Sequence, residues 1–255
     1  MERERGKWNG QMARQAEKLT ALAMGWLLSL ALFPSHAHAE AFGVAIKPRG
    51  WGFSATTVIN GKLEMELVID SGSSFTIISH QAARQLGIFK QLGQAPRYPL
   101  SAGGGIVWVR LVVLESVRVG GAVAHGVEGA VADLPSFKGA HGLLGKSYLD
   151  RYSFRINSPA KTMELAPHNN EPLYGGRSEG WWRNEAKRLR GQATLFQDME
   201  QGVENSIHTG YTPERLLKQK LSKSDVGRLA SYFKMLLARL EKEASSLGAP
   251  EEWMR

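Results

Sequence analysis

The chain has 255 residues, contains no cysteine and carries a formal net charge of +8 at neutral pH. The lack of cysteine excludes disulfides, cysteine metal sites and thiol catalysis. Lys and Arg are not gathered into blocks with interleaved aromatic residues, so we expect no nucleic-acid partner. The length and an ordinary apolar share of 43% allow one or two domains with cores of their own.

The N-terminal segment has the three parts of an export signal. A basic start precedes an apolar run at residues 19–33, and the tripeptide "AHA" at positions 37–39 places small residues where a signal peptidase cleaves. The apolar run is short for a membrane span, which needs about 20 residues. We therefore expect residues 1–39 to be a cleaved signal peptide and the mature protein to be periplasmic. The alternative is an inner-membrane anchor through residues 19–33, with the rest of the chain facing the periplasm.

Residues 42–166 have the pattern of short strands joined by tight turns. Asn60-Gly61 is a strong signal for a type I′ hairpin, and apolar and polar residues alternate after it as far as Ile69. Gly120-Gly121 and a Ser-Pro turn farther along predict two more hairpins. Many short strands with glycine turns predict a mainly β fold, a small closed β barrel.

One helix is expected to interrupt these strands. Ser79 can cap its N-terminus, "HQAARQL" fills it, and Gly87 suits the position just after its end.

The amino-acid composition changes from about Asn169, where a polar, turn-rich linker begins. Beyond it we predict helices at "WWRNEAKRLRGQATLFQDMEQG", at "TPERLLKQKL" with Thr212 as its N-cap, and over a final amphipathic segment. The apolar residues of the last segment recur at three-and-four spacing: Val226, Leu229, Phe233, Leu236, Leu237 and Leu240. Such a stripe favours packing against the barrel or a partner helix. We expect these helices to stabilise a dimer or to gate a substrate groove.

The segment "MELVIDSGSSFTIIS" ends an apolar strand in a carboxylate, Asp70. A carboxylate at the rim of a core is costly unless it is hydrogen-bonded or paired. Gly72 permits a sharp turn and close approach of another chain, while Ser71 and the following amides can hold the carboxylate in place. A rigid carboxylate of limited hydration suits general acid–base catalysis, although Asp-Ser-Gly also occurs in ordinary turns.

A second element, "HGLLGKSYLDRYSFRIN", follows some seventy residues later. Leu143, Leu144 and Gly145 are expected to pack beside the Asp70 loop and, with Ser73, to support its shape. Taken alone, the segment is equally typical of a buried strand that ends at a glycine.

Residues 50–166 resemble the retropepsin-like aspartic proteases, in particular their exported bacterial members. The resemblance rests on the Asn-Gly hairpin, "VIDSGSSFTIIS", "HQAARQLGI", "SAGGG" and "GLLGKSYL", in this order and spacing. It implies that Asp70 is the catalytic aspartate and that Ser71 and Gly72 complete the active-site triplet.

The same resemblance implies a flap, a hairpin that closes over substrate, near Leu100–Trp108. The substrate-contacting residues would then be those of its tip: Ser101, Ala102, Gly103, Gly104 and Gly105. These glycines could equally form a passive loop.

Aspartic protease chemistry needs two carboxylates that share one proton. None of the other aspartates, Asp133, Asp150, Asp198 and Asp225, is followed by Ser/Thr-Gly. The second carboxylate should therefore come from another copy of the chain, across a two-fold axis. We expect a homodimeric endopeptidase acting on a protein or peptide substrate, without a cofactor.

The sequence leaves two alternatives to an aspartic peptidase open and gives other hydrolases little support. A serine hydrolase has little support, because the G-x-S-x-G match at residues 176–180 stands in the polar, turn-rich linker and does not follow a predicted strand as a nucleophile elbow does. A zinc site has little support either, because no H-E-x-x-H is present and the histidines are scattered. A non-catalytic periplasmic binding module, with a helical tail that recruits a partner, stays open, as does a membrane-tethered structural protein. The expected organisation is a signal or anchor at 1–39, a retropepsin-like domain at 40–167, and a linker with helices at 168–255.

Overall fold

The computed structural model describes residues 41–50, 52–102, 105–133, 140–168, 173–202 and 221–255. All of these belong to one compact unit, Ala39–Arg255. The predicted export segment at 1–39 and the helix expected to begin after Thr212 lie outside the described residues. Among the residues described, no helix is long and apolar enough to cross a bilayer.

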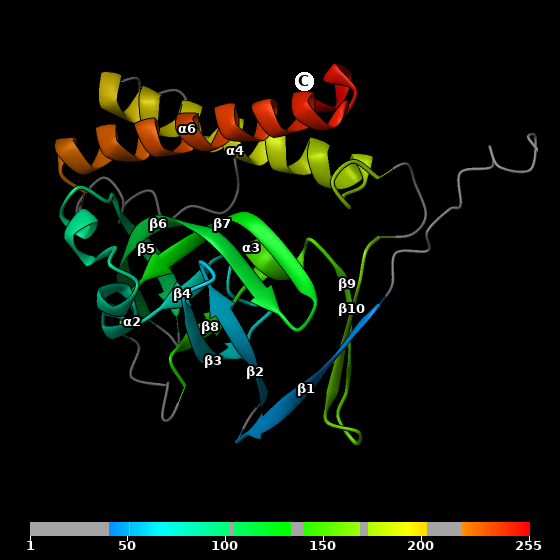
Figure 1. The fold of residues 1–255 in the computed structure, drawn as a ribbon. Coiled ribbons are helices and arrows are strands. Elements are labelled where there is room, and N and C mark those ends of the chain that lie inside the picture. The colour runs from blue at the N-terminus through cyan, green and yellow to red at the C-terminus, as the bar shows by residue number, and fades with distance from the viewer. Residues whose placement is uncertain (1–40, 51, 103–104, 134–139, 169–172, 203–220) are drawn as a thin grey trace, which may run out of the picture. The chain divides into compact units, whose positions relative to one another are not determined.

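Ten strands within the described residues hydrogen-bond in the order β5-β6-β7-β4-β8-β3-β2-β1-β10-β9. Their bounds are β1 Phe42–Arg49, β2 Gly52–Ile59, β3 Leu63–Ile69, β4 Thr76–Ile78, β5 Arg97–Ala102, β6 Gly105–Val119, β7 Ala122–Val131, β8 Gly142–Leu144, β9 Ser153–Asn157 and β10 Thr162–Ala166. A further pairing of β2 with β6 joins Thr57 to Val119 and Ile59 to Val117. This pairing closes β6-β7-β4-β8-β3-β2 into a ring of strands, so the prediction of a mainly β fold is confirmed (Figure 1).

The inside of this strand ring is apolar. Side chains from all around the ring are buried there, among them Ala55, Ile59, Leu67, Leu114, Val117, Val127 and Leu144. Tyr148, from the short helix α3 Lys146–Leu149, fills the same core and donates its hydroxyl to the carbonyl of Ala122 at 3.0 Å. Burial of this apolar surface, at about 25 cal/mol per Å², stabilises the closed arrangement.

Local sequence signals define several of the connections. Asn60 and Gly61 both have positive φ, 52° and 63°, as the type I′ turn between β2 and β3 requires. The helix α2, His80–Gln85, begins at Ser79, whose hydroxyl accepts from the N–H of Ala82. Gly87 follows the end of α2 with φ 76°, as predicted for a position that favours glycine.

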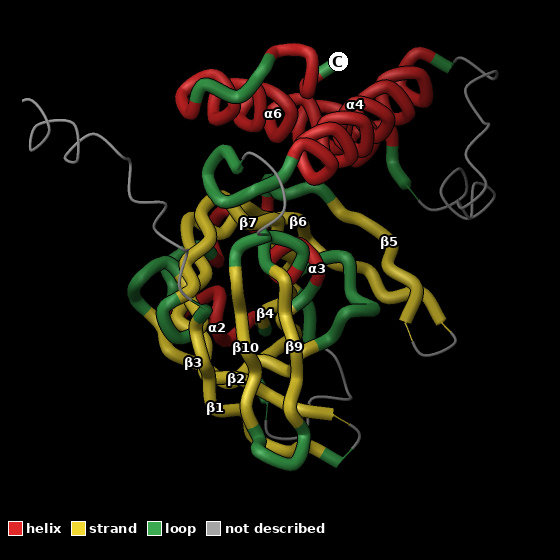
Figure 2. Tube along the Cα trace, turned by 90° about the vertical axis from the view of Figure 1, so that its right-hand side faces the viewer, coloured by secondary structure: helices red, strands yellow, loops and turns green. Residues whose placement is uncertain are grey.

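The C-terminal part contains two long helices, α4 Glu179–Gln201 and α6 Lys223–Leu247, and the 3₁₀ turn η3 Glu251–Met254. Another 3₁₀ turn, η2 Phe89–Gly93, stands between α2 and β5. Ser178 and Ser222 cap the two helices at their N-termini, and Gly202 and Gly248 end them in the left-handed conformation. Both helices lie together on one side of the strands (Figure 2).

These helices share a core with the strand ring. Their apolar faces, with Trp182, Phe196 and Phe233, pack with Val109, Leu111, Ala130 and Ala132 of β6 and β7 in one continuous cluster. The hydroxyl of Tyr232 in α6 also donates to the carbonyl of Val112 in β6 at 2.9 Å. The amphipathic stripe therefore packs against α4 and the strands, as its spacing indicated.

Candidate active site

Asp70 stands at the point where the chain leaves the strand ring. It follows β3 directly, and its backbone N–H donates to the carbonyl of Leu144 at 3.1 Å. The side chain is half-buried, and Asp70 lines the cleft described below. The backbone of Asp70 is thus fixed by hydrogen bonding to the sheet, while the residue itself lines the cleft.

Gly72 holds the carboxylate of Asp70 directly. Its backbone N–H donates to Asp70 Oδ1 at 2.9 Å, and Ser73 N–H donates to the Asp70 carbonyl at 3.2 Å. A Cβ at position 72 would lie 3.1 Å from Asp70 Oδ1, closer than most such contacts. Ser71 and Gly72 are exposed in the single chain, at the outer edge of this turn.

The segment at 143–145 lies against the Asp70 loop. Leu143 and Leu144 form part of β8, which pairs in parallel with β3 and antiparallel with β4. After β8, a Cβ added at Gly145 would lie 2.1 Å from the Phe75 carbonyl oxygen and 2.8 Å from that of Ser73. Only glycine allows the two segments to approach so closely.

Further hydrogen bonds fasten the two segments together. Ser73 Oγ donates to the carbonyl of Phe75 at 2.8 Å, and the carbonyl of Ser73 accepts from the N–H of Lys146 at 2.8 Å. Ser147 Oγ accepts from the N–H of Thr76 at 2.9 Å. Ser147 was not anticipated from the sequence, because its partner lies 71 residues away and a serine after Gly-Lys carries no local signal for such a contact.

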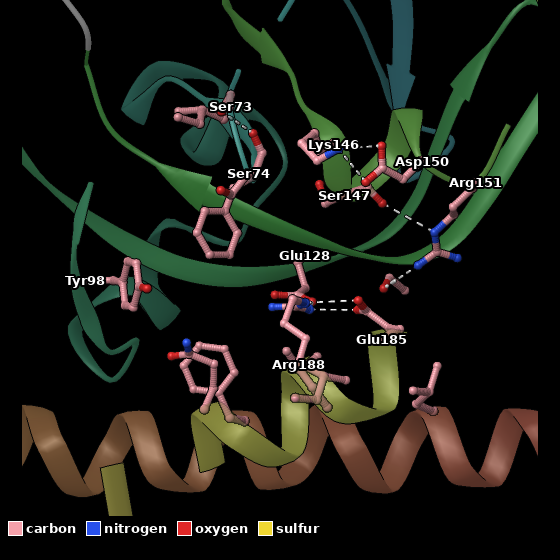
Figure 3. Close-up of a pocket in the computed structure, with 18 of the residues that line it drawn as sticks. Ser73, Ser74, Tyr98, Glu128, Lys146, Ser147, Asp150, Arg151, Glu185 and Arg188 are labelled. Carbon is pink, nitrogen blue, oxygen red and sulfur yellow. Dashed lines mark hydrogen bonds and ion pairs between the residues drawn. The ribbon is translucent and has the colours of Figure 1, made fainter. Parts of the chain in front are cut away.

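Asp70 lines a cleft of about 1380 Å³. Figure 3 shows other residues of its lining, among them Ser73 and Tyr98. The Asp70 loop contributes Gly72 to Phe75, and the β5–β6 hairpin contributes Tyr98 to Ser101 together with Val107. Helices α4 and α6 supply another wall, which includes Trp181, Leu189, Phe233 and Leu236. Residues of β7, β8 and the α3 segment also belong to the lining. The predicted tail helices therefore line the same cleft as Asp70.

The hairpin expected to act as a flap is formed by β5 and β6, paired from Arg97↔Arg110 to Ala102↔Gly105. Ser101 lines the cleft, and Gly105 is exposed at the start of β6. Gly103 and Gly104, at the tip, lie outside the described residues.

The base of this hairpin is held by aromatic contacts. The ring of Tyr98 meets those of Phe75, Phe196 and Phe233 edge-on, with centroids 5.7, 6.4 and 6.4 Å away. Phe196 of α4 and Phe233 of α6 stack on each other at 5.7 Å. One strand of the hairpin is thereby tied both to the Asp70 loop and to the helices.

A buried ionic cluster lies between β7 and α4. Glu128, 7% exposed, and Glu185 both accept hydrogen bonds from the guanidinium of Arg188 (Figure 3). Burial raises the pKa of Glu128 to about 7, although Arg188 acts in the opposite direction. Burial also pulls the pKa of Glu185 upward, but the hydrogen bond and charge of Arg188 outweigh it and leave that pKa below its ordinary value.

Within the described part of the chain, no three His, Cys, Asp or Glu residues are grouped so that they could hold a metal ion. Asp70 itself is a hydrogen-bonded carboxylate in a cleft lined by polar and apolar side chains.

The family comparison agrees with this geometry. Residues 55–148 match the family model described as Aspartyl protease. No curated protein matches the chain. Among solved structures, the chain is similar to the crystal structure of a retropepsin-like aspartic protease from Rickettsia conorii, with 25% identity and a TM-score of 0.39, over 50% of this chain and 90% of that one.

The matched segment contains the Asn-Gly hairpin, the Asp70 triplet, α2, the β5–β6 hairpin and the Gly145 contact. Over residues 55–148 the chain is therefore similar to the aspartyl protease family.

Proposed function

We propose that the chain is an aspartic endopeptidase that works as a homodimer, with Asp70 of each copy supplying one of the two catalytic carboxylates. One observation carries the proposal: the Asp70 carboxylate is held by the Gly72 N–H at the wall of a large cleft. The aspartyl protease match over residues 55–148 supports the same reaction class.

The need for a second copy follows from the sequence and the chemistry. Asp70 is the only aspartate in the chain that is followed by Ser/Thr-Gly. Two carboxylates a few ångströms apart cannot both ionise easily, so their proton affinities separate and one proton is shared. A two-fold axis beside Gly72 would bring the exposed turn of one copy against its mate.

In such a dyad the ionised carboxylate takes a proton from a water molecule, whose oxygen attacks the carbonyl carbon of the scissile peptide bond. The protonated carboxyl donates its proton to the carbonyl oxygen, which gives a neutral tetrahedral diol. Collapse of the diol transfers a proton to the leaving nitrogen and restores the shared proton. The Gly72 N–H would orient its carboxylate throughout and keep it partly dehydrated.

The test compares Asp70→Asn with the wild-type chain on a denatured, fluorescently labelled protein, between pH 3 and pH 8. We expect cleavage to fall by about 10²–10⁴-fold, because Asn cannot take up or give the proton. Asp198→Asn, on α4 and outside the cleft lining, serves as the matched control and should keep full activity. Equal cleavage by the Asp70 variant would remove this residue from the mechanism.

The binding-module alternative makes the opposite prediction for the same protein. A module of that kind would bind peptides but would leave them intact at every pH, and Asp70→Asn would leave that binding unchanged. Intact peptides recovered after saturating binding by the wild-type chain would favour it over the enzyme.

We also propose that the protein is exported to the periplasm, with residues 1–39 removed. The motivating feature is the order of a basic start, a short apolar run and the "AHA" tripeptide at 37–39. Mass analysis of the N-terminus after cell fractionation tests this. A mature chain beginning at Glu40 supports cleavage, whereas an intact N-terminus in the membrane fraction supports the anchor.

A further inference from the structure

One end of the cleft carries an excess of cationic side chains. Arg151, two residues after the end of α3, donates to three backbone carbonyls: Ser147 at 3.3 Å, His125 at 2.8 Å and Gly126 at 3.3 Å. These neutral acceptors fix the guanidinium but leave its charge uncompensated. Among the described residues, no carboxylate lies within ion-pair distance of Arg151 (Figure 3).

Arg177 adds a second guanidinium to the same region. It is only 3% exposed, and it pairs with Glu243 of α6. Its guanidinium carbon lies 4.6 Å from the ring centroid of Trp181, and that of Arg151 lies 5.7 Å from the same centroid. Arg177 Nε is buried and has no acceptor among the described residues.

Arg239 of α6 brings a third positive charge. A Cβ built on Gly126 would lie 3.0 Å from Arg239 Nη2, so this guanidinium lies beside Gly126, the residue whose carbonyl accepts from Arg151. Arg151, Arg177, Arg239 and Glu243 all line the cleft that also contains Asp70. Three cations against the single carboxylate of Glu243 leave a local charge of about +2.

Two neighbouring groups of charges are paired among themselves. Lys146 pairs with Asp150 at 2.8 Å, and Arg188 pairs both with Glu185, at 2.7 Å, and with Glu128, whose pKa is raised to about 7 by burial. Burial, and next the charge of Arg177, lower the pKa of Arg151, which means that the two guanidiniums repel each other in a poorly hydrated place. A half-buried charge with no counter-ion is costly, and an anion held there would remove that cost.

We propose that Arg151, Arg177 and Arg239 form an anion subsite that binds a carboxylate of the peptide substrate. The carboxylate is either an acidic side chain or the C-terminal carboxylate of the peptide, since both present the same pair of oxygens to a guanidinium. The assignment of the ligand as substrate rests on the proposed peptidase function. The subsite gives the enzyme a preference for acidic or C-terminal segments on the helix side of Asp70.

The test measures binding apart from cleavage, with the full-length Asp70→Asn chain. The probes are fluorescein-labelled random decapeptide pools in four forms: a free or amidated C-terminus, and one scanned position fixed as Glu or Gln. Fluorescence anisotropy should give about tenfold tighter binding, or more, for a carboxylate pool than for its neutral counterpart. The Glu/Gln pair and the acid/amide pair separate the two sources of the carboxylate.

Variants in the same Asp70→Asn background locate the effect. Arg151→Gln should abolish the preference for carboxylate pools. Arg151→Lys loses the same carbonyl contacts but keeps the positive charge, so it should retain most of this preference. Arg239→Gln, on an exposed residue, should weaken the preference without harming the fold, and Glu243→Gln should strengthen it. Arg118→Gln is the matched control, because Arg118 also donates to a backbone carbonyl, that of Gly120, but does not line the cleft.

Two results would overturn the subsite. One is equal or undetectable binding of the carboxylate and neutral pools, and the other is an Arg151→Gln variant that retains the full preference. Cleavage by the wild-type chain reports separately on the peptidase proposal. Carboxylate-dependent binding without any cleavage would reject the peptidase function and keep the subsite. Cleavage whose rate does not depend on carboxylates in the peptide would keep the peptidase function and reject the subsite.

Discussion

Gly145 and Phe75 approach each other so closely that a Cβ on Gly145 would lie 2.1 Å from the Phe75 carbonyl oxygen. The two residues are 70 positions apart in the chain, and they join the end of β8 to the loop that carries Asp70. Because the obstacle is backbone and not a flexible side chain, any larger residue at 145 must displace this loop.

Gly145→Ala is therefore expected to destabilise the protein by about 3 kcal/mol or more, through overpacking against backbone. Urea unfolding followed by circular dichroism measures the change. Gly191→Ala is the matched control, since Gly191 is exposed in α4 and a Cβ there meets nothing within 4 Å. The free energy of unfolding of this control should rise by about 0.5–1 kcal/mol, because Ala has the better helix propensity. A similar rise for Gly145→Ala would refute the close contact.

The proposed dyad, shared between two copies, predicts that Asp70→Asn inhibits the wild-type chain by forming mixed dimers. If dimers exchange freely, an equimolar mixture should contain about one quarter wild-type homodimer, so activity per wild-type chain should fall to about half. The measurement is proteolysis after co-incubation at a total concentration at which sedimentation shows dimers. Activity that stays proportional to the wild-type chain added would show that one copy is sufficient.

Tyr98 is expected to couple the β5–β6 hairpin to the helices. Tyr98→Ala should cost about 3 kcal/mol, because it removes an aromatic side chain from contacts with Phe75, Phe196 and Phe233. Tyr98→Phe, the control, keeps the ring and should change stability little. A double-mutant cycle with Phe233→Leu should give a coupling energy of about 1 kcal/mol, and a coupling near zero would contradict the contact.

The raised pKa of Glu128 predicts that the protein loses stability as the pH rises toward neutrality. Its pKa is raised from 4.5 to about 7, so between these values the folded state holds a proton that the unfolded state has released. The free energy of unfolding should then fall by about 3 kcal/mol across this window and level off above pH 7. Glu128→Gln removes this contribution, and the difference between the two stability curves isolates it.

The charged residues that face Glu128 from α4, Glu185 and Arg188, are retained in that variant, as is Arg239 of α6. Glu115→Gln, on an exposed carboxylate of β6, should leave the pH dependence unchanged. Parallel curves for the wild type and Glu128→Gln between pH 4.5 and pH 7 would refute the raised pKa.

Much of the secondary structure between residues 42 and 166 could be predicted, because the sequence signals for its turns and helix caps are local. Asn60-Gly61 adopts positive φ at little cost, and Ser79 satisfies a free N–H at the start of α2, so each defines its element without help from distant residues. The contacts of Ser147 and Arg188 could not be predicted in this way. Their partners Thr76 and Glu128 lie 71 and 60 residues away, and neither spacing has a periodic signature.

The sequence by itself determined the order of turns and strands, the place of Asp70 at the end of an apolar strand, and the apolar stripe of α6. These follow from backbone preferences and from the period of the side chains. Only the tertiary structure decided where the helices lie: against β5, β6 and β7, as a wall of the Asp70 cleft. The reason is physical, because an apolar stripe specifies that a face will be buried but does not specify the surface that buries it. That choice depends on the fit between faces that come together only when the chain folds.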